Sequence, residues 1–466
     1  MTDILANTPD CRTSNRRVLA LATRSMLLSV ALCWAPAVVA QIVPPGAAPP
    51  APIIPQPLTV DGVPTGTVAN PLRVYGDDAP MLSGLDILSG LGLKITGQMA
   101  VEYNDNIARR PGDVPLSPRY NSRDDWSFRP NVSISAGRAL GRQTLFVNGS
   151  VGRDYYVHNT RLNRDRMAIN GGVNWALGVR CGGRVQGGYS QRGTQFGAFV
   201  EVVPSTQKRW SFQAGGTCRT ATGLSANLNY SRYSVRNETD VLLSSIDRSF
   251  ADVNTQRLSG GIGYPLGVRG EIGIQGQWQE QEYINQLLPN GAINGSNTYG
   301  ANVFANYRLG SSLRLTGGLG RSWVRRNHGL ADTFSGTTWN LGLNYIGPRL
   351  GANVSMGRSA NGSSGGASNY SIGKFLNGSV NYRANDRLHF VAGYAHDNQD
   401  YHGFSPLPQT EPIRTSTMDR YFVGTDYRLN RILGLSLDYQ HQRRKSEPGV
   451  FSYSANVVTL TARASF

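Results

Sequence analysis

The chain ends in VVTLTARASF, residues 457–466, and apolar and polar side chains alternate along this stretch. The even positions are apolar and finish with an aromatic residue: Val458, Leu460, Ala462, Ala464 and Phe466. The odd positions are polar: Thr459, Thr461, Arg463 and Ser465. A period of two predicts a β-strand with two unlike faces. A strand in the wall of a membrane barrel needs such faces, because one meets lipid and the other meets a polar lumen.

The composition agrees with a barrel and disagrees with two other classes. The 466 residues include 55 Gly, 39% are hydrophobic, and the mean hydropathy is −0.31. This is too polar for a helical membrane protein, and no stretch after residue 40 reaches 18 consecutive apolar residues. The chain is also too rich in alternating Tyr, Trp, Val and Leu to be disordered. If it enters a membrane, it must do so as a closed barrel.

The N-terminal region predicts export. Arg16, Arg17 and Arg24 precede the apolar run 25–39, and Val38-Val39-Ala40 forms a small-residue cleavage site. We therefore expect a signal peptide over 1–40. Residues 41–92 begin with the proline-rich QIVPPGAAPPAPIIPQPL and predict an extended periplasmic linker, with a possible short helix over 81–92.

Residues 93–466 repeat the alternating pattern to the end of the chain. Typical segments are LKITGQMAVEY (93–103), WSFRPNVSISA (126–136), LSANLNYS (224–231), LGANVSMG (350–357) and LGLSLDYQ (433–440). We count about 18 strands of roughly ten residues, the pattern expected of a transmembrane outer-membrane barrel. The fold class is thus all-β, an antiparallel barrel of about 18 strands.

The predicted connections alternate between tight and long. Tight ones include GYPLGVRG and YRLNRILG, and long polar ones include 104–125 and 399–419. Short turns belong in the periplasm and long loops outside, so an even number of strands puts both termini in the periplasm. The protein is therefore expected in the outer membrane of a Gram-negative bacterium. A propeller repeats at a similar length, but its blades do not alternate short and long loops.

Two rings of side chains are predicted on the lipid-facing side. A tyrosine precedes each of five tight turns and would form a periplasmic girdle: Tyr264, Tyr307, Tyr345, Tyr382 and Tyr427. Eight positions beyond a leucine on the same face lie four cations: Arg153, Arg232, Arg321 and Arg358. Eight strand residues rise about 26 Å, which matches the apolar band. These cations would then meet lipopolysaccharide phosphates at the outer rim; alternatively, the strands have already become loops there.

The opposite parity predicts a hydrophilic lumen. It carries Asn, Ser and Thr, the acids Glu102, Glu271, Asp426 and Asp438, and a larger number of cations. These predicted pore-lining cations are Lys94, Arg129, Arg184, Arg192, Arg257, Arg308, Arg314, Arg383, Arg428 and Arg463. An excess of positive charge favours anions, unless the arginines only pair with the acids in the wall.

Five aromatic residues also take the inward parity: Phe146, Tyr156, Phe304, Phe375 and Phe422. Their rings could stack on sugars in a polar pore; a β-bulge that shifts the register by one would instead turn them to lipid. Of the four cysteines, Cys181 and Cys218 are predicted to lie in two neighbouring tight turns, and we expect a disulfide between them. The terminal Phe466 resembles the signal that the barrel assembly machinery recognises.

No catalytic, cofactor or metal motif emerges. The six His are scattered, and there is no G-x-S-x-G elbow or Walker loop. We therefore expect no enzymatic activity and no cofactor. The basic charge could indicate nucleic acid, but export argues against it.

Several segments resemble one family. VEYNDNIARRPGD (101–113), 126–165 and NWALGVRCGGRVQGGYSQR (174–192) are similar to outer-membrane barrels encoded with exopolysaccharide biosynthesis genes, the beta-barrel porin type 2 group. The likeness lies in the Asp105-Asn106 pair, the LGRQ turn, the tyrosine after the third strand and the W-x-L-G end of the fourth. It covers most of 93–466 but not the proline-rich segment.

The resemblance implies a porin that secretes an exopolysaccharide, with a periplasmic polysaccharide export protein as partner. The basic lumen would suit an acidic polymer. Two other functions stay open: a general or anion-preferring diffusion porin, and an outer-membrane enzyme or adhesin.

Overall fold

The computed structural model describes residues 92–116, 120–194, 205–239, 248–287, 291–327, 333–362, 370–402 and 414–466. The predicted signal peptide (1–40) and the predicted linker up to residue 91 lie outside the described residues.

The described residues form 18 strands in one sheet. The first nine are β1 (Lys94–Asn104), β2 (Asp125–Leu140), β3 (Gln143–Tyr156), β4 (Arg164–Leu177), β5 (Cys181–Thr194), β6 (Ser205–Arg219), β7 (Ser225–Thr239), β8 (Val253–Leu266) and β9 (Gly270–Leu287). The others are β10 (Ile293–Leu309), β11 (Leu313–Arg326), β12 (Phe334–Ile346), β13 (Leu350–Gly362), β14 (Tyr370–Arg383), β15 (Leu388–His402), β16 (Thr415–Arg428), β17 (Leu433–Glu447) and β18 (Tyr453–Ser465).

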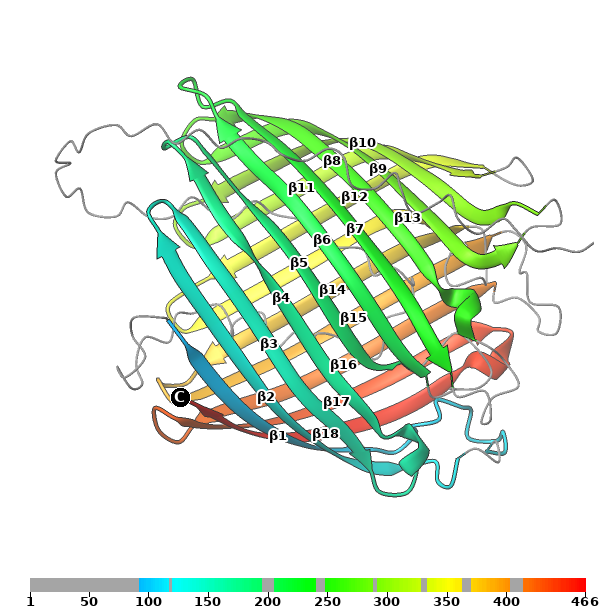
Figure 1. Ribbon diagram of the computed structural model, residues 1–466. Coiled ribbons are helices and arrows are strands. Elements are labelled where there is room, and N and C mark those ends of the chain that lie inside the picture. The colour runs from blue at the N-terminus through cyan, green and yellow to red at the C-terminus, as the bar shows by residue number, and fades with distance from the viewer. Residues whose placement is uncertain are drawn as a thin grey trace, which may run out of the picture. The chain divides into compact units, whose positions relative to one another are not determined.

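Each strand pairs antiparallel with its neighbours in sequence, and the sheet closes on itself. The closing pair is β1 with β18, in register from Thr96↔Ser465 to Asn104↔Val457. Phe466 extends this seam, because its N–H donates to the Ile95 carbonyl and its carbonyl accepts from the Ile95 N–H (2.8 and 3.0 Å). Figure 1 accordingly places the C-terminus beside the start of β1. The prediction of a closed antiparallel barrel of about 18 strands is confirmed.

The strands are longer than predicted. They span 11 to 18 residues rather than about ten, and β15 and β16 extend into the segment 399–419 that was predicted to be a loop. The reason is that the apolar–polar alternation reports only the part of a strand that faces an apolar medium. Backbone pairing continues beyond it, where the outward side chains are polar.

The barrel has two unlike ends. The connections after even-numbered strands are tight, and we call this the short-turn end; those after odd-numbered strands lie at the long-loop end. Two tight turns repeat the sequence Leu-Gly-Val-Arg, and their glycines Gly178 and Gly267 both have φ of +62°. This left-handed conformation favours glycine, which has no Cβ to clash.

The described residues include three short 3-10 helices in connections at the long-loop end: η3 (Thr160–Leu162), η5 (Arg248–Ala251) and η6 (Gly449–Phe451). Among the described residues, no helix is long and apolar enough to cross a membrane.

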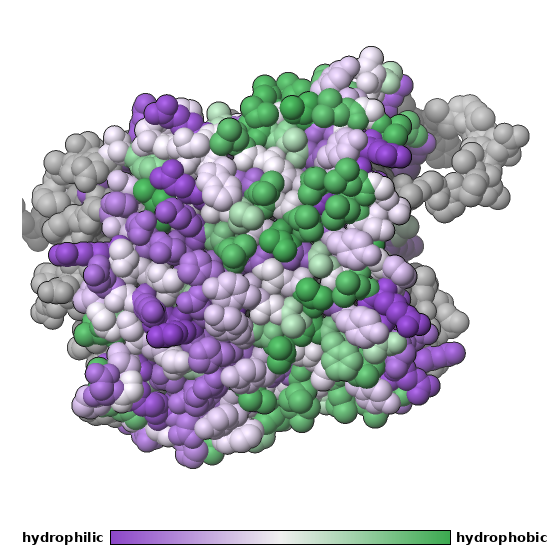
Figure 2. All heavy atoms as spheres, turned by 180° about the vertical axis from the view of Figure 1, so that it is seen from behind, coloured by the Kyte–Doolittle hydropathy of each residue, from purple (hydrophilic) through white to green (hydrophobic). Residues whose placement is uncertain are grey.

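Apolar side chains cover much of the outer face. Val132, Val151, Leu319 and Leu460 are all exposed there, on alternate positions of their strands. Figure 2 shows apolar side chains in a broad band on one side of the molecule, with hydrophilic side chains beside it. A barrel with an apolar outer band and a polar interior has the architecture of an outer-membrane protein.

Candidate functional site: the lumen

The strand register defines the lumen wall. Paired residues point to the same side of a sheet, so the facing can be followed around the barrel from Arg314, through Asn344 on β12, to Asn353 on β13 and Ser379 on β14. The predicted polar residues fall on this one face: Thr298, Asn302, Asn306, Thr338, Asn340, Asn344, Asn353, Ser355, Asn377, Ser379 and Asn381. Hydrogen bonds such as Asn353 Nδ2 to Ser379 Oγ (2.9 Å) join neighbouring members.

The ten predicted cations lie on the same face, at two levels. Seven are within four residues of the short-turn end: Lys94, Arg184, Arg308, Arg314, Arg383, Arg428 and Arg463. The other three, Arg129, Arg192 and Arg257, lie in the half of the barrel near the long loops. The two levels differ in how the charges are compensated.

Near the long loops, cations pair with acids. The Arg129 guanidinium donates two hydrogen bonds to the Glu102 carboxylate (2.8 and 2.6 Å). Asp154 lies 3.8 Å from Arg129 Nε and 3.0 Å from Arg166 Nε, and so bridges the two guanidiniums. Arg420 pairs with Asp397 at 2.7 Å across β15 and β16. The charges of Arg129, Arg166 and Arg420 are therefore compensated by carboxylates.

Other cations in this half contact neutral partners. Arg192 Nη2 donates to Gln207 Oε1 (3.1 Å), and Arg257 Nη2 donates to Gln277 Oε1 (2.7 Å). The Arg209 guanidinium lies 4.7 Å from the centre of the Tyr233 ring. Asp154, Arg166, Arg209, Asp397 and Arg420 were not among the predicted pore residues, although their parity on the strands marks them as inward.

Near the short turns, four lumen-facing arginines form no ion pair with an acid among the described residues. Arg308, Arg383 and Arg428 are exposed and Arg314 is half-buried. None of these four forms an ion pair within the described part of the chain, where ion pairs occur only elsewhere. Arg184 donates through Nε to Asn174 Oδ1 (2.6 Å) and lies over the Phe146 ring at 5.0 Å. The positive charge of these arginines is thus not compensated by an ion pair with a described residue.

The five predicted aromatic residues do face inward, but most lie against the wall. Phe304, Phe375 and Phe422 each cover a glycine on the neighbouring strand, and Phe422 is only 7% exposed. Tyr156 packs against a cluster of loop residues made by Ile107, Ala108, Tyr120 and Leu162. The glycines opposite the rings lack side chains, so the rings fill that space instead of projecting into the lumen. Stacking on sugars stays a prediction for them.

The residues of the two predicted rings lie at strand positions that face lipid. The five girdle tyrosines occupy outward positions within four residues of the short turns. Of the predicted rim cations, Arg153 pairs with Asp165 (3.2 Å), Arg321 donates to Ser335 Oγ (3.0 Å), and Arg358 donates to the Thr337 carbonyl (3.1 Å). Arg232 on β7 has the same outward parity.

A second aromatic girdle was missed. It lies toward the long loops, where outward rings pair across neighbouring strands: Tyr103 with Trp126, Tyr189 with Trp210, and Tyr394 with Tyr421. Their ring centres are 5.0, 4.5 and 4.8 Å apart. Two aromatic girdles that bound an apolar band are typical of a barrel in a membrane. The signal in the sequence was the recurrence of Trp and Tyr on the lipid parity.

Cys181 and Cys218 face each other directly across β5 and β6, with their Cα atoms 4.1 Å apart, and they form a disulfide. Both lie within strands at the short-turn end, whereas the sequence placed them in the turns.

The first long loop is tied to the seam. The Asp105 carboxylate accepts from the N–H and the Nδ2 of Asn456 (2.7 and 2.6 Å), and Asn106 Nδ2 donates to the Ser454 carbonyl (2.8 Å). Farther along this loop, Ser122 Oγ donates to Asp124, and this hydrogen bond holds the pKa of the Asp124 carboxyl below its ordinary value. The Asp105-Asn106 pair thus joins β1 to β18.

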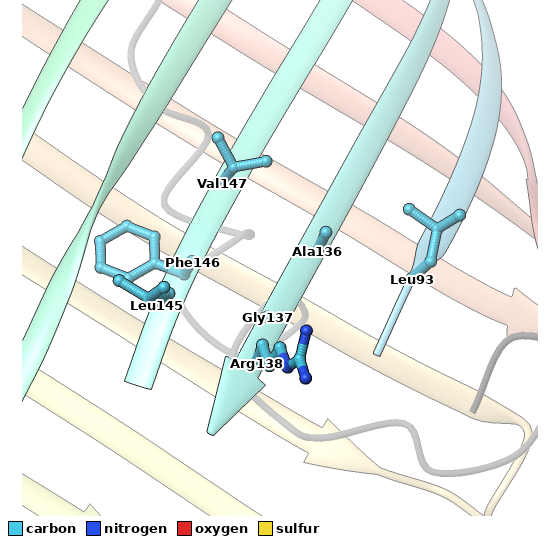
Figure 3. Close-up of a pocket in the computed structure, with 7 residues that line it drawn as sticks. All are labelled: Leu93, Ala136, Gly137, Arg138, Leu145, Phe146 and Val147. Carbon is cyan, nitrogen blue, oxygen red and sulfur yellow. The ribbon is translucent and has the colours of Figure 1, made fainter. Parts of the chain in front are cut away.

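A shallow groove at the short-turn end lies beside the start of β1. It is lined by Leu93, Ala136, Gly137, Arg138, Leu145, Phe146 and Val147, as Figure 3 shows. Most of these side chains are apolar and have the lipid-facing parity, so this groove is separate from the lumen. Among the described residues, no group of three or more His, Cys, Asp and Glu could hold a metal ion.

No family model and no curated protein matches the sequence. Among solved structures, the FrpB iron transporter of Neisseria meningitidis aligns with a TM-score of 0.48 and 11% identity, over 78% of this chain and 63% of that one. OpdK of Pseudomonas aeruginosa aligns with a TM-score of 0.43 and 11% identity, over 80% of this chain and 99% of that one. The alcaligin receptor FauA of Bordetella pertussis gives 0.41 and 13%, over 79% and 76%. This chain spans less than two thirds of the FrpB chain, and the similarity is one of fold.

Proposed function

We propose that this protein is an outer-membrane channel for hydrophilic solutes and that it prefers anions. The observation that carries the proposal is the row of exposed arginines without acidic partners on the lumen face, including Arg308, Arg383 and Arg428. A barrel of this number of strands is wide enough to enclose an aqueous channel. We further propose that the short-turn end faces the periplasm, as in other barrels of this type.

The physical basis is electrostatic. A lumen bounded by protein of low dielectric constant focuses the field of its wall charges, and a positive field raises the local concentration of anions. The uncharged Asn, Gln, Ser and Thr side chains between the two levels of charge offer hydrogen bonds to hydrated solutes of either sign. The preference for anions therefore depends on the uncompensated arginines.

The test is the ion selectivity of the full chain in a planar lipid bilayer. The reversal potential under a KCl gradient should report a higher permeability for chloride than for potassium. A preference for potassium would contradict the proposal, as would folded protein that inserts but conducts no current.

Secretion of an acidic exopolysaccharide is a second candidate. It is supported by the resemblance of 101–113, 126–165 and 174–192 to porins encoded with exopolysaccharide genes, and by the basic lumen. In a deletion strain, polymer should decrease in the medium and accumulate in the periplasm, and complementation should restore secretion. Unchanged secretion would leave the diffusion channel as the function.

A further inference from the structure

Most of the net charge of this protein lies at one end of the barrel. The short turns, the four strand residues on each side of them, the first four residues of β1 and the last four of β18 contain fifteen cations and three acids. The cations are Lys94, Arg138, Arg142, Arg180, Arg184, Arg219, Arg269, Arg308, Arg314, Arg349, Arg383, Arg387, Arg428, Arg431 and Arg463. The acids are Glu271, Asp386 and Asp426. The difference is +12, compared with +16 for the whole 466-residue chain.

These arginines are also arranged in pairs. At four places, the N–H of the last arginine of a strand donates to the carbonyl of an arginine in the adjacent turn, at 2.8 or 2.9 Å. The pairs are Arg219 with Arg180, Arg308 with Arg269, Arg383 with Arg349, and Arg428 with Arg387. Each pair directly follows an outward-facing pair in the register, such as Cys181↔Cys218 or Leu388↔Tyr427, and so continues the lumen face.

One pair extends to three residues. Arg308 also lies opposite Arg314 in the register of β10 and β11, so Arg308 has Arg314 on one side and Arg269, in the turn before β9, on the other. Like charges directly opposite each other destabilise a sheet. A repeated arrangement that costs stability is expected where it has a function. Arginines that outnumber the acids around them, as these do by fifteen cations to three acids, can bind anions with several oxygens, because guanidinium groups donate paired hydrogen bonds to carboxylates and phosphates.

Lipid headgroups do not account for these arginines. The side of the barrel that meets lipid at this level carries the girdle tyrosines Tyr307, Tyr382 and Tyr427, and the arginine that follows each of them has the opposite parity. The repeated Tyr-Arg dipeptide thus places one ring toward lipid and one cation toward the lumen at each of three turns.

We propose that the paired arginines at the short-turn end, which we call the arginine rim, form a binding site for small multivalent oxyanions such as phosphates and polycarboxylates. This inference rests on the proposed function, since the rim lies on the path of a solute through the channel. The inference adds that the arginine rim selects the anions. The cations near the long loops do not, because they contact acids, amides or aromatic rings.

The test uses the full chain in planar bilayers and inorganic pyrophosphate as the probe. Pyrophosphate should reduce the KCl current of the wild type in a saturable way. The rim variant Arg308→Gln/Arg314→Gln should require at least about tenfold more pyrophosphate for the same reduction, because charge-assisted hydrogen bonds are lost. Citrate in place of pyrophosphate distinguishes a site for carboxylates from one restricted to phosphates.

The matched control is Arg192→Gln/Arg257→Gln, which removes the same charge from the lumen wall near the long loops. It should keep the wild-type response to pyrophosphate. Folding of each variant is checked by the shift in gel migration on heating, and Arg383→Gln/Arg428→Gln serves if the first rim variant fails to fold.

The possible results separate the two proposals. A wild type without anion preference contradicts the proposed function. Anion preference together with an unchanged pyrophosphate response in the rim variants overturns the arginine rim alone. The proposal of the arginine rim is also contradicted if the control variant loses the response to pyrophosphate to the same extent.

Discussion

At the scale of single residues, the direction of each side chain is decided by its parity on a strand. Leu460 is 49% exposed on the outer face, whereas its neighbour Thr461 faces the lumen. The alternation in 457–466 predicted this correctly, because successive residues of a strand must point to opposite sides. The direction of a side chain can therefore be read from the sequence without knowledge of its contacts.

A pair of substitutions tests this assignment. Leu460→Arg should lower the free energy of unfolding in lipid vesicles by about 2–4 kcal/mol, because a cation would be forced into the apolar band. Thr461→Arg places the same charge in the polar lumen and should change it much less. Unfolding in urea, followed by tryptophan fluorescence, measures both. Equal losses would show that the two faces are assigned wrongly.

The disulfide between Cys181 and Cys218 closes a segment of 37 residues. Restricting the unfolded chain in this way should stabilise the barrel by about 2–4 kcal/mol. Reduction should therefore lower the urea midpoint of the wild type and leave that of Cys181→Ser/Cys218→Ser unchanged. A wild-type midpoint that does not respond to reduction would contradict the expected contribution.

At the scale of elements, the strands are longer than their apolar segments. The sequence pattern weakens where the outward residues become polar, as in β15 after His396, and the predicted strand ends were too early for this reason. Hydrogen bonds between strands do not depend on side-chain polarity, so pairing continues. The alternation of apolar and polar residues alone therefore could not locate the strand ends.

The seam between β1 and β18 depends on contacts that lie more than 300 residues apart in sequence. Asp105→Ala removes both hydrogen bonds to Asn456 and should destabilise the closed barrel by about 1–3 kcal/mol, because two half-buried donors lose their partner. The temperature at which gel migration shifts should fall accordingly. Asp113→Ala, at an exposed position of the same loop, is the control and should leave that temperature unchanged. A similar fall in both variants would argue against a specific role for Asp105.

At the scale of the whole molecule, closure involves the last residue of the chain. The backbone of Phe466 pairs with Ile95, and its ring is 54% exposed on the outer face. Phe466→Ala keeps the backbone pairing, so a defect in this variant would come from the ring alone. If the assembly machinery recognises the ring, the amount of folded barrel in the outer membrane should fall severalfold while the unfolding midpoint of purified protein stays the same. Normal amounts in the membrane would contradict recognition of the ring.

The sequence by itself determined the fold class, the number of strands, the two faces of the wall and the girdle near the short turns. These features follow from local spacing, because a period of two and the turn residues between strands act over a few positions only. Ten of the inward cations could be predicted for the same reason, whereas Arg166, Arg209 and Arg420 on the same face were missed.

Only the tertiary structure decided which charges compensate each other. Arg129 meets Glu102 and Asp154, and Arg308 meets Arg269 and Arg314, because register brings neighbouring strands together at defined heights. Whether an inward arginine has an acid or another arginine beside it depends on residues up to 41 positions away, as for Arg428 and Arg387. The sequence therefore indicated a basic lumen, and the register decided which of its arginines meet acids and which meet other arginines.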